Sequence, residues 1–161
     1  MKLRLLFIIK MAMLLFLCGC INAQEKVTGM KNTTEKLMGY FEKCDSSGIT
    51  SIFDDAENLE YKIDEIKADC TAFALIVKKY GIPLRDKMTI SKGLSGENIV
   101  SLQLISKADS SLNLSNASLL VFFYPDKYLN NTNKILNYAF IRTPLKEQEK
   151  KFIIAPKLPR Q

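Results

Sequence analysis

The chain has 161 residues, of which 47% are apolar and 25% are charged, and its formal net charge is +6. This size and composition predict one domain with its own hydrophobic core, and they argue against a disordered chain or a two-domain enzyme. The sequence contains no His and no Trp. Without His, the chain has no Ser-His-Asp or Cys-His catalytic site and no zinc site with imidazole ligands.

The first 20 residues have the organisation of an export signal. Lys2, Arg4 and Lys10 make the start basic, and an uncharged apolar run follows over residues 11–17. A basic start, a short apolar segment and small residues at its end are typical of a secretory signal. The run is much shorter than the ~20 apolar residues that span a bilayer, so a permanent transmembrane anchor is the weaker interpretation.

The end of the apolar run, Leu17-Cys18-Gly19-Cys20, resembles the lipobox of bacterial lipoproteins, in which an aliphatic residue and two small residues precede a cysteine. The resemblance implies cleavage before Cys20 and attachment of fatty acyl chains, such as palmitate, to that residue. Ile21 replaces the Asp that retains many such proteins in the inner membrane. The resemblance therefore implies a lipid-anchored protein of the bacterial cell envelope and favours the outer membrane.

Two alternatives to lipidation stay open. Cleavage after Ala23 would leave a periplasmic or secreted soluble protein that begins at Gln24, and an uncleaved leader would itself be an anchor. In the lipoprotein interpretation, residues 1–19 are the signal peptide and residues 20–32, which are mostly polar, form a tether. Loss of the signal removes three basic residues and no acidic one, so the net charge falls from +6 to +3. This modest charge does not indicate a nucleic-acid partner.

Only Cys44 and Cys70 lie in the expected folded domain. Two thiols in an oxidising compartment can pair, but each also suits a buried apolar position. If their helices pack antiparallel, Cys70 lies ~15 Å beyond the position opposite Cys44 at 1.5 Å per residue, which is too far for a bridge. A turn between the helices could close this gap, so the disulfide stays open. Two cysteines alone do not make a structural zinc site, and we expect no metal or cofactor.

The folded domain is expected over residues 33–155, and its first part is helical. Residues 32–35 (NTTE) predict a helix start, and residues 46–48 (SSG) predict its end. Asp54 and Asp55 fit the start of a longer helix over about residues 55–80. Apolar residues recur along it in steps of four and three, at Leu59, Ile63, Ile66, Cys70, Phe73, Val77 and Tyr80.

After Gly81 and Pro83, which end that helix, the pattern changes to strands. Four segments rich in β-branched, aromatic and aliphatic residues alternate with turn-forming segments, over residues 82–91, 98–107, 118–124 and 134–142. Such short connections favour an antiparallel meander. Residues 152–155 could add a fifth strand, before a tail over residues 156–161. The sequence therefore predicts an α+β domain in which helices pack on a four- to five-stranded antiparallel sheet.

This element order, over about residues 33–142, resembles the cystatin-like and nuclear-transport-factor-2-like architectures, in which a curved sheet wraps a helix. The short strand that the second family places between its second and third helices is not evident, because the apolar pattern through Leu59 and Ile63 is helical. Both architectures include binding modules and enzymes, so the resemblance implies no particular activity.

Asp86 is a weak candidate for a catalytic carboxylate. In an extended strand it would share a face with Leu84, Met88 and Ile90, and burial among them would raise its pKa toward that of a useful base. Alternatively, Asp86 lies on an exposed edge between Arg85 and Lys87. The first placement would fit a small carboxylate-based isomerase or hydrolase.

Aromatic residues of the last two strands could form an apolar binding surface, namely Phe122, Phe123, Tyr124, Tyr138 and Phe140. Adjacent residues of a strand face opposite sides, so Phe122 and Phe123 cannot both lie beneath the helices. One apolar face then requires cover from the C-terminal segment or from a partner. The sequence favours a membrane-tethered binding module without catalytic activity, with an envelope protein as partner; the Asp86 enzyme is the alternative.

Overall fold

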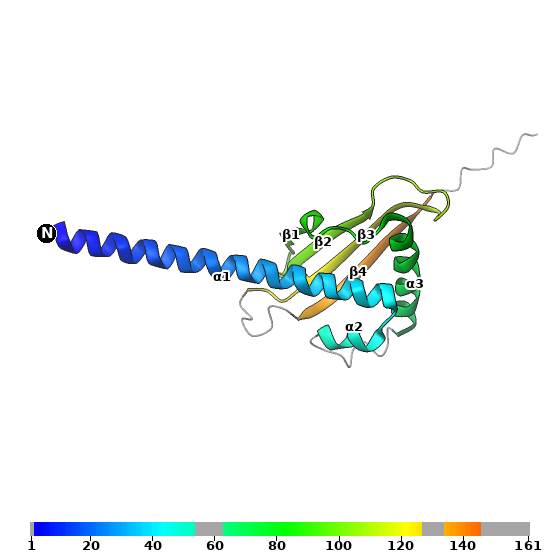
Figure 1. The fold of residues 1–161 in the computed structure, drawn as a ribbon, viewed down its shortest axis with the longest axis horizontal. Coiled ribbons are helices and arrows are strands. Elements are labelled where there is room, and N and C mark those ends of the chain that lie inside the picture. Colours follow the sequence, from blue (N-terminus) through cyan, green and yellow to red (C-terminus); the bar gives the residue numbers. More distant parts are fainter. Residues whose placement is uncertain (1, 54–62, 127–133, 146–161) are drawn as a thin grey trace, which may run out of the picture.

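The structure, a computed structural model, describes the backbone of residues 2–53, 63–126 and 134–145, and the side chains of these ranges from Ala23 onward. Helices α1 (Lys2–Lys43), α2 (Ser46–Ile52) and α3 (Ile63–Tyr80) precede the strands. Figure 1 shows α1 as a long helix whose C-terminal part crosses one face of a sheet. The described residues thus form helices packed on a four-stranded antiparallel sheet, which confirms the α+β class.

Helix α1 begins far before the predicted start at Asn32. Met30 is only 1% exposed and belongs to the hydrophobic core, so the segment preceding Asn32 already packs on the domain. The hydroxyl of Thr34 does not cap a new helix but donates a hydrogen bond to the carbonyl of Met30, 3.0 Å away. The expectation of a tether over residues 20–32 is therefore wrong for the backbone, which is helical throughout that range.

The corner between α1 and α2 is a Schellman motif followed directly by a helix cap. The N–H of Asp45 donates to the carbonyl of Tyr40 (2.9 Å), and the N–H of Cys44 donates to that of Phe41 (3.2 Å). The Asp45 carboxylate then accepts a hydrogen bond from the N–H of Gly48 (2.9 Å) and caps α2. The segment SSG, predicted to end a helix, is thus the first turn of the next one.

The predicted long helix over residues 55–80 is confirmed from Ile63 to Tyr80, while residues 54–62 lie outside the described residues. Its predicted end is also confirmed. Gly81 has a φ of 79°, and its N–H donates to the carbonyl of Val77 at 2.8 Å. Glycine adopts this left-handed conformation without the clash that a Cβ atom would cause.

The strands are β1 (Thr89–Lys92), β2 (Asn98–Ile105), β3 (Leu114–Phe123) and β4 (Ile135–Pro144), and each pairs antiparallel with its neighbour in the chain. The predicted first strand begins seven residues late, because Arg85–Lys87 form a short 3-10 helix, η2, instead. Arg85 in this turn donates to the carbonyl of Thr28 in α1 at 3.1 Å. Residues 152–161, with the predicted fifth strand and tail, lie outside the described residues.

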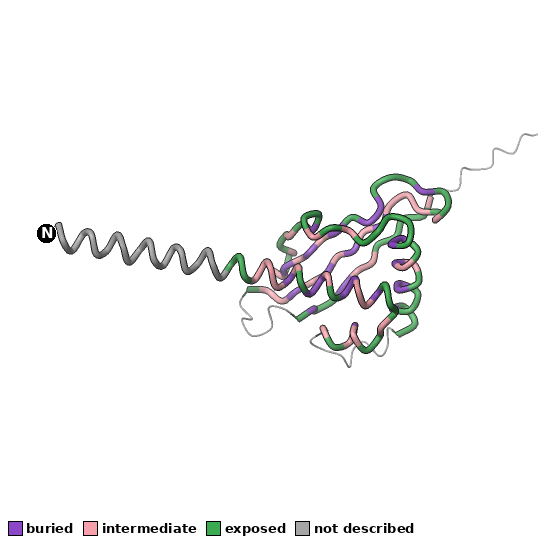
Figure 2. The backbone as a smooth tube through the Cα atoms, in the orientation of Figure 1, coloured by how far each residue is buried: buried purple, intermediate pink, exposed green. Residues whose placement is uncertain are grey.

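The core lies between the helices and the inner face of the sheet, where buried residues concentrate in Figure 2. Its aromatic centre joins α1, α3 and β4. The ring of Phe41 lies 5.7 Å from that of Phe73 and 5.2 Å from that of Tyr138, and Phe73 lies 6.1 Å from Phe140. Phe53, just after α2, also forms a single parallel bridge with Ile135 of β4, a pairing that the sequence pattern did not predict.

Candidate functional site

The face of the sheet opposite the helices is the first candidate site. On the inner face, Val100 and Val121 pair with each other and are fully buried, as is Leu119. Because side chains alternate along a strand, the residues between them point to the other face. The paired residues Ile99 and Phe122 are of this kind, and they are half-buried.

This open face is defined here by the strand residues that the pairing register places opposite the buried set. They are Thr89, Ser91, Ile99, Ser101, Gln103, Asn116, Ser118, Leu120, Phe122, Asn137, Ala139, Ile141 and Thr143. None of these residues is charged, although 25% of the chain is. Ile141, at the end of the apolar series on β2 to β4, is 47% exposed.

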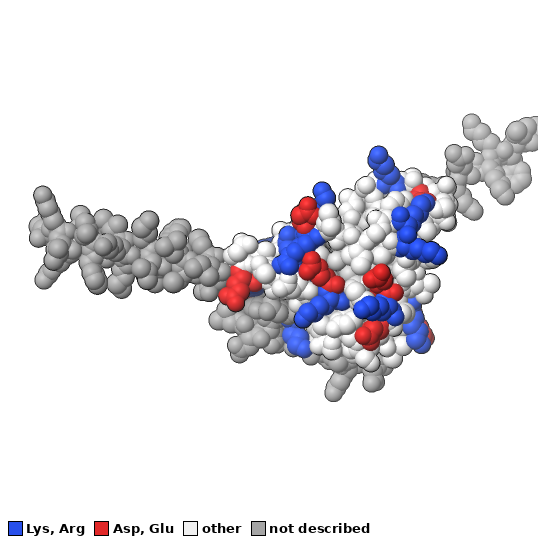
Figure 3. All heavy atoms as spheres, viewed as in Figure 1, with Lys and Arg blue, Asp and Glu red and all other residues white. Residues whose placement is uncertain are grey.

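The side of the molecule that α1 crosses is different in character. Figure 3 shows that Lys and Arg residues are interspersed with Asp and Glu residues over this side. A solvated protein surface normally carries such mixed charges, whereas the centre of a protein interface is depleted of them. Among the described strands, the open face therefore lacks the mixed charges that cover the helix side, and in this one respect it resembles the centre of an interface.

The five aromatic residues predicted to form one surface lie on different sides of the sheet. Phe123 is fully buried and Tyr138 is 9% exposed, both against the helices, and Phe140 packs against the same core. Phe122 is on the open face, and Tyr124 is half-buried beyond the end of β3. The expectation that Phe122 and Phe123 face opposite sides is confirmed, while the grouping of all five as one surface is wrong.

Asp86 does not lie in an apolar cavity. It is exposed, in the middle of η2, rather than in an extended strand. Its expected neighbours separate, because Leu84 is 68% exposed while Met88 is 3% exposed. The 3-10 turn breaks the alternation on which the prediction depended, and so the structure gives no support to Asp86 as a buried base.

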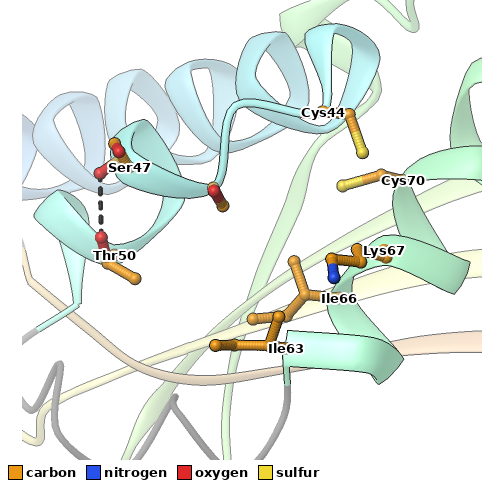
Figure 4. Close-up of a pocket in the computed structure, with 8 residues that line it drawn as sticks. Cys44, Ser47, Thr50, Ile63, Ile66, Lys67 and Cys70 are labelled. Atoms are coloured by element: carbon orange, nitrogen blue, oxygen red, sulfur yellow. Dashed lines mark hydrogen bonds between the residues drawn. The ribbon is translucent and has the colours of Figure 1, made fainter.

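A pocket of about 400 Å³ lies between the α1–α2 corner, α2 and α3 (Figure 4). Ser47 and Thr50 of α2 line one side, and their dashed contact is the 2.9 Å hydrogen bond from the Thr50 hydroxyl to the Ser47 carbonyl. Ile66 and Lys67 of α3 line the other side. The pocket thus offers mainly apolar walls with hydroxyl groups and one ammonium group.

The structure brings Cys44 and Cys70 together at one side of this pocket, both as free thiols. Figure 4 shows their sulfur atoms directed toward each other. Cys44 is exposed, whereas Cys70 is 1% exposed. Burial, followed by a hydrogen bond with the Cys44 side chain, raises the pKa of Cys70 to about 12. The ~15 Å offset that antiparallel packing would give does not apply, because α3 crosses beyond the end of α1 (Figure 1).

A buried polar cluster between α3 and β4 was not predicted. The carboxylate of Asp69, which is 4% exposed, accepts a hydrogen bond from the Tyr138 hydroxyl (3.2 Å) and pairs with Arg142 (3.0 Å). Burial raises the pKa of Asp69, and the Tyr138 hydrogen bond and the Arg142 charge oppose this shift. The sequence does carry a signal, since Tyr138 and Arg142 are four residues apart in one strand and so share a face.

Two further carboxylates, those of Asp109 and Asp126, join segments at the edges of the domain. Asp109 accepts hydrogen bonds from Lys79 (2.5 Å), the Tyr80 hydroxyl and the Ser111 N–H (2.9 Å), and these partners lower its pKa. Asp126, beyond β3, pairs with Lys26 of α1 and Lys92 of β1. These contacts, led by the Lys26 hydrogen bond, lower the pKa of Asp126. The polar contacts of Lys26 place the docked part of α1 only six residues after Cys20.

Cys20 itself lies in the part of α1 where the structure describes only the backbone, so its lipidation stays a prediction. Within the side chains that are described, no group of three or more His, Cys, Asp or Glu residues could hold a metal ion. In the same part of the chain, no helix is long and apolar enough to cross a bilayer. No protein-family description matches the chain, and neither a curated protein nor a solved structure matches it.

Proposed function

We propose that this chain is an exported, lipid-anchored binding module whose open sheet face holds an apolar surface of another cell-envelope protein. The observation that carries the proposal is the composition of that face, which is uncharged throughout its described strand residues and includes an apolar group, Ile99, Leu120 and Phe122, on the two central strands. The second candidate, catalysis at Asp86, has no comparable support, because that carboxylate is exposed.

The residues on the open face favour a protein partner. Ile99, Leu120 and Phe122 lie on neighbouring positions of β2 and β3, and polar residues such as Ser91 and Asn137 flank them on the outer strands. The centre of a protein–protein interface is depleted of charged residues, as this face is. Desolvation of this face costs little, because no strand residue on it requires a counter-ion.

The export signal determines where the partner is to be sought. Cleavage before Cys20 and acylation of that residue would place the domain at the envelope, with the outer membrane favoured by Ile21. One acyl chain binds a membrane only marginally, while two or more hold it firmly at ~0.8 kcal/mol per buried methylene. A partner in the same compartment meets the open face without competition from cytosolic proteins.

Lipidation is tested by labelling cells with a radioactive or clickable fatty acid. Cys20→Ala should abolish the label and leave an unprocessed precursor. Cys18→Ala, the matched control two residues earlier, should retain the label, because alanine is an ordinary small residue at that lipobox position. Label that persists in Cys20→Ala, or a mature chain that begins at Gln24, would contradict the anchor.

Binding is tested with a photo-crosslinking amino acid at Ile141, which is 47% exposed on the open face. The control is the same amino acid at Lys36, which is exposed on α1. We expect a crosslink to a different envelope protein from position 141 in intact cells and none from position 36. A dimer of this chain, a crosslink to its own residues 146–161, or no product would each overturn the assignment of this face to an envelope partner.

A further inference from the structure

The residue that ends α1 occupies a position at which glycine is strongly favoured. Cys44 is the residue C′ of the Schellman motif, and its φ is 52°. A side chain in this left-handed region is disfavoured, because its Cβ atom crowds the following carbonyl. The cysteine therefore does not ease the backbone conformation of this corner, and we ask what its side chain contacts.

That side chain contacts Cys70. Cys70 lies on the buried face of α3, and its sulfur is directed toward that of Cys44 across the wall of the pocket (Figure 4). Both residues line the same pocket, and nothing drawn in Figure 4 lies between the two sulfur atoms. Cys44 therefore combines a disfavoured backbone conformation with a side chain that is directed toward a buried thiol.

We propose that Cys44 and Cys70 form a disulfide bond that joins the end of α1 to α3 along the pocket. Cys44 is the exposed member and reacts first with an external oxidant, which is a small-molecule or protein disulfide. The Cys44 thiolate attacks one sulfur of the oxidant, a mixed disulfide forms, and the first oxidant thiol leaves with one proton.

The second step closes the bond. The sulfur of Cys70 loses its proton and attacks the Cys44 sulfur of the mixed disulfide, and the second oxidant thiol leaves with that proton. Two protein thiols are thus oxidised to one disulfide, and the oxidant disulfide is reduced to two thiols. The buried Cys70 sulfur is then sheltered from external thiols, so reduction should begin by attack on the exposed Cys44 sulfur.

The proposal does not depend on the lipid anchor or on the partner, and purified full-length chain in detergent is sufficient to test it. After oxidation with glutathione disulfide, tryptic cleavage leaves Cys44 on the peptide 44–62 and Cys70 on the peptide 68–78. We expect mass spectrometry to find these two peptides joined and to find them separate after treatment with dithiothreitol. Glutathione attached to Cys44 beside an unreacted Cys70, or no reaction at either residue, would overturn the proposal.

Thermal unfolding gives a second measurement. Oxidation should raise the Tm of the wild-type domain by about 5–15 °C. The bond closes the loop from Cys44 to Cys70 and so lowers the conformational entropy of the unfolded chain. Cys70→Ser should remove this rise. Cys44→Gly should also remove it, but it should unfold at a higher temperature than the reduced wild type, because glycine relieves the left-handed conformation. A Cys44→Gly chain less stable than the reduced wild type would contradict the assigned role of this cysteine.

Discussion

Asp69 is the most deeply buried carboxylate that the structure describes between the helices and the sheet, and its partners come from β4. Tyr138 donates a hydrogen bond to it, and Arg142 supplies the opposite charge from a partly exposed position. Burial raises the pKa of Asp69, so this residue contributes stability that is fully present below its unfolded pKa and is lost as the pH rises through its folded pKa. The two partners reduce this loss.

Tyr138→Phe should therefore destabilise the domain by about 1–3 kcal/mol at pH 7, because a buried carboxylate loses a hydrogen bond. The pKa of Asp69 should rise further, since that bond lowers it. Urea unfolding at pH 7 and pH 4, with NMR titration of the carboxyl carbon, measures both effects. A free-energy loss that is equal at the two pH values would contradict the role of the ionised carboxylate.

Asp109 should make the domain sensitive to acid. Its partners lower its pKa below the ordinary 3.8, so its stabilising contribution is present above the unfolded pKa and is lost as the pH falls through the folded one. Asp109→Asn should be less stable than the wild type at pH 7 and should lose less stability on acidification below about pH 4. Urea unfolding across this range is the measurement.

Asp86→Asn is the matched control for that experiment, because Asp86 is exposed. Its unfolding free energy at pH 7 should differ from that of the wild type by no more than about 0.5 kcal/mol. If the curve of unfolding free energy against pH for Asp109→Asn is parallel to that of the wild type, the ion pair with Lys79 does not contribute to folding.

At the scale of elements, the spacing of apolar residues predicted a helix correctly, whereas a capping motif predicted a helix start wrongly. The spacing of Ile66, Cys70 and Phe73 correctly indicated a helix with one buried face, and all three are buried. The cap signal at Asn32 was misleading, because Thr34 satisfies its hydroxyl within the helix and Met30 extends the packed face toward the N-terminus. Tertiary burial decided the helix start, and a single-residue cap motif does not report it.

In the strands too, the repeating pattern of residues was a reliable guide, whereas a contact with a distant residue could not be predicted. Alternation along β3 correctly separated Phe122 from Phe123, and this was enough to predict an uncovered apolar face. The pattern did not show that residues before Thr89 form a 3-10 turn, because Arg85 is held there by the Thr28 carbonyl of distant α1. The prediction that Asp86 lies in an extended strand is wrong for this reason. A contact between residues more than fifty positions apart leaves no local trace in a sequence.

The docking of α1 can be measured by truncating Met30. If the segment before Asn32 packs as the structure describes, Met30→Ala should cost about 2–5 kcal/mol of unfolding free energy, because it leaves a cavity in the core. Lys36→Ala, at an exposed position of the same helix, should change it by no more than about 0.5 kcal/mol. A change at Met30 as small as that at Lys36 would show that the segment is a tether after all.

At the scale of the whole molecule, α1 connects the proposed anchor directly to the folded domain. The helix is continuous through residues 20–32, and its side chains engage the domain from Lys26 onward. The open face therefore has a fixed rotational relation to Cys20 about the helix axis. A flexible tether would have left that relation free.

Alanine insertions after Asn22 test this relation. One inserted residue turns the domain by about 100° relative to the anchor, two turn it by about 200°, and four return it to within about 40° of its original direction. For a partner held in the same membrane, the crosslink from position 141 should weaken with one or two alanines and recover substantially with four. Equal yields for all three insertions would indicate a flexible connection.

With the proposed lipid at Cys20, the contact between Lys26 and Asp126 would also limit how far the domain lies from the bilayer. Six residues of helix rise only ~9 Å, whereas a twelve-residue extended leash would reach ~40 Å. A lipid-anchored chain built in this way cannot search the periplasm for distant binding partners. Whatever it recognises must itself come to the membrane surface, within little more than the width of the domain.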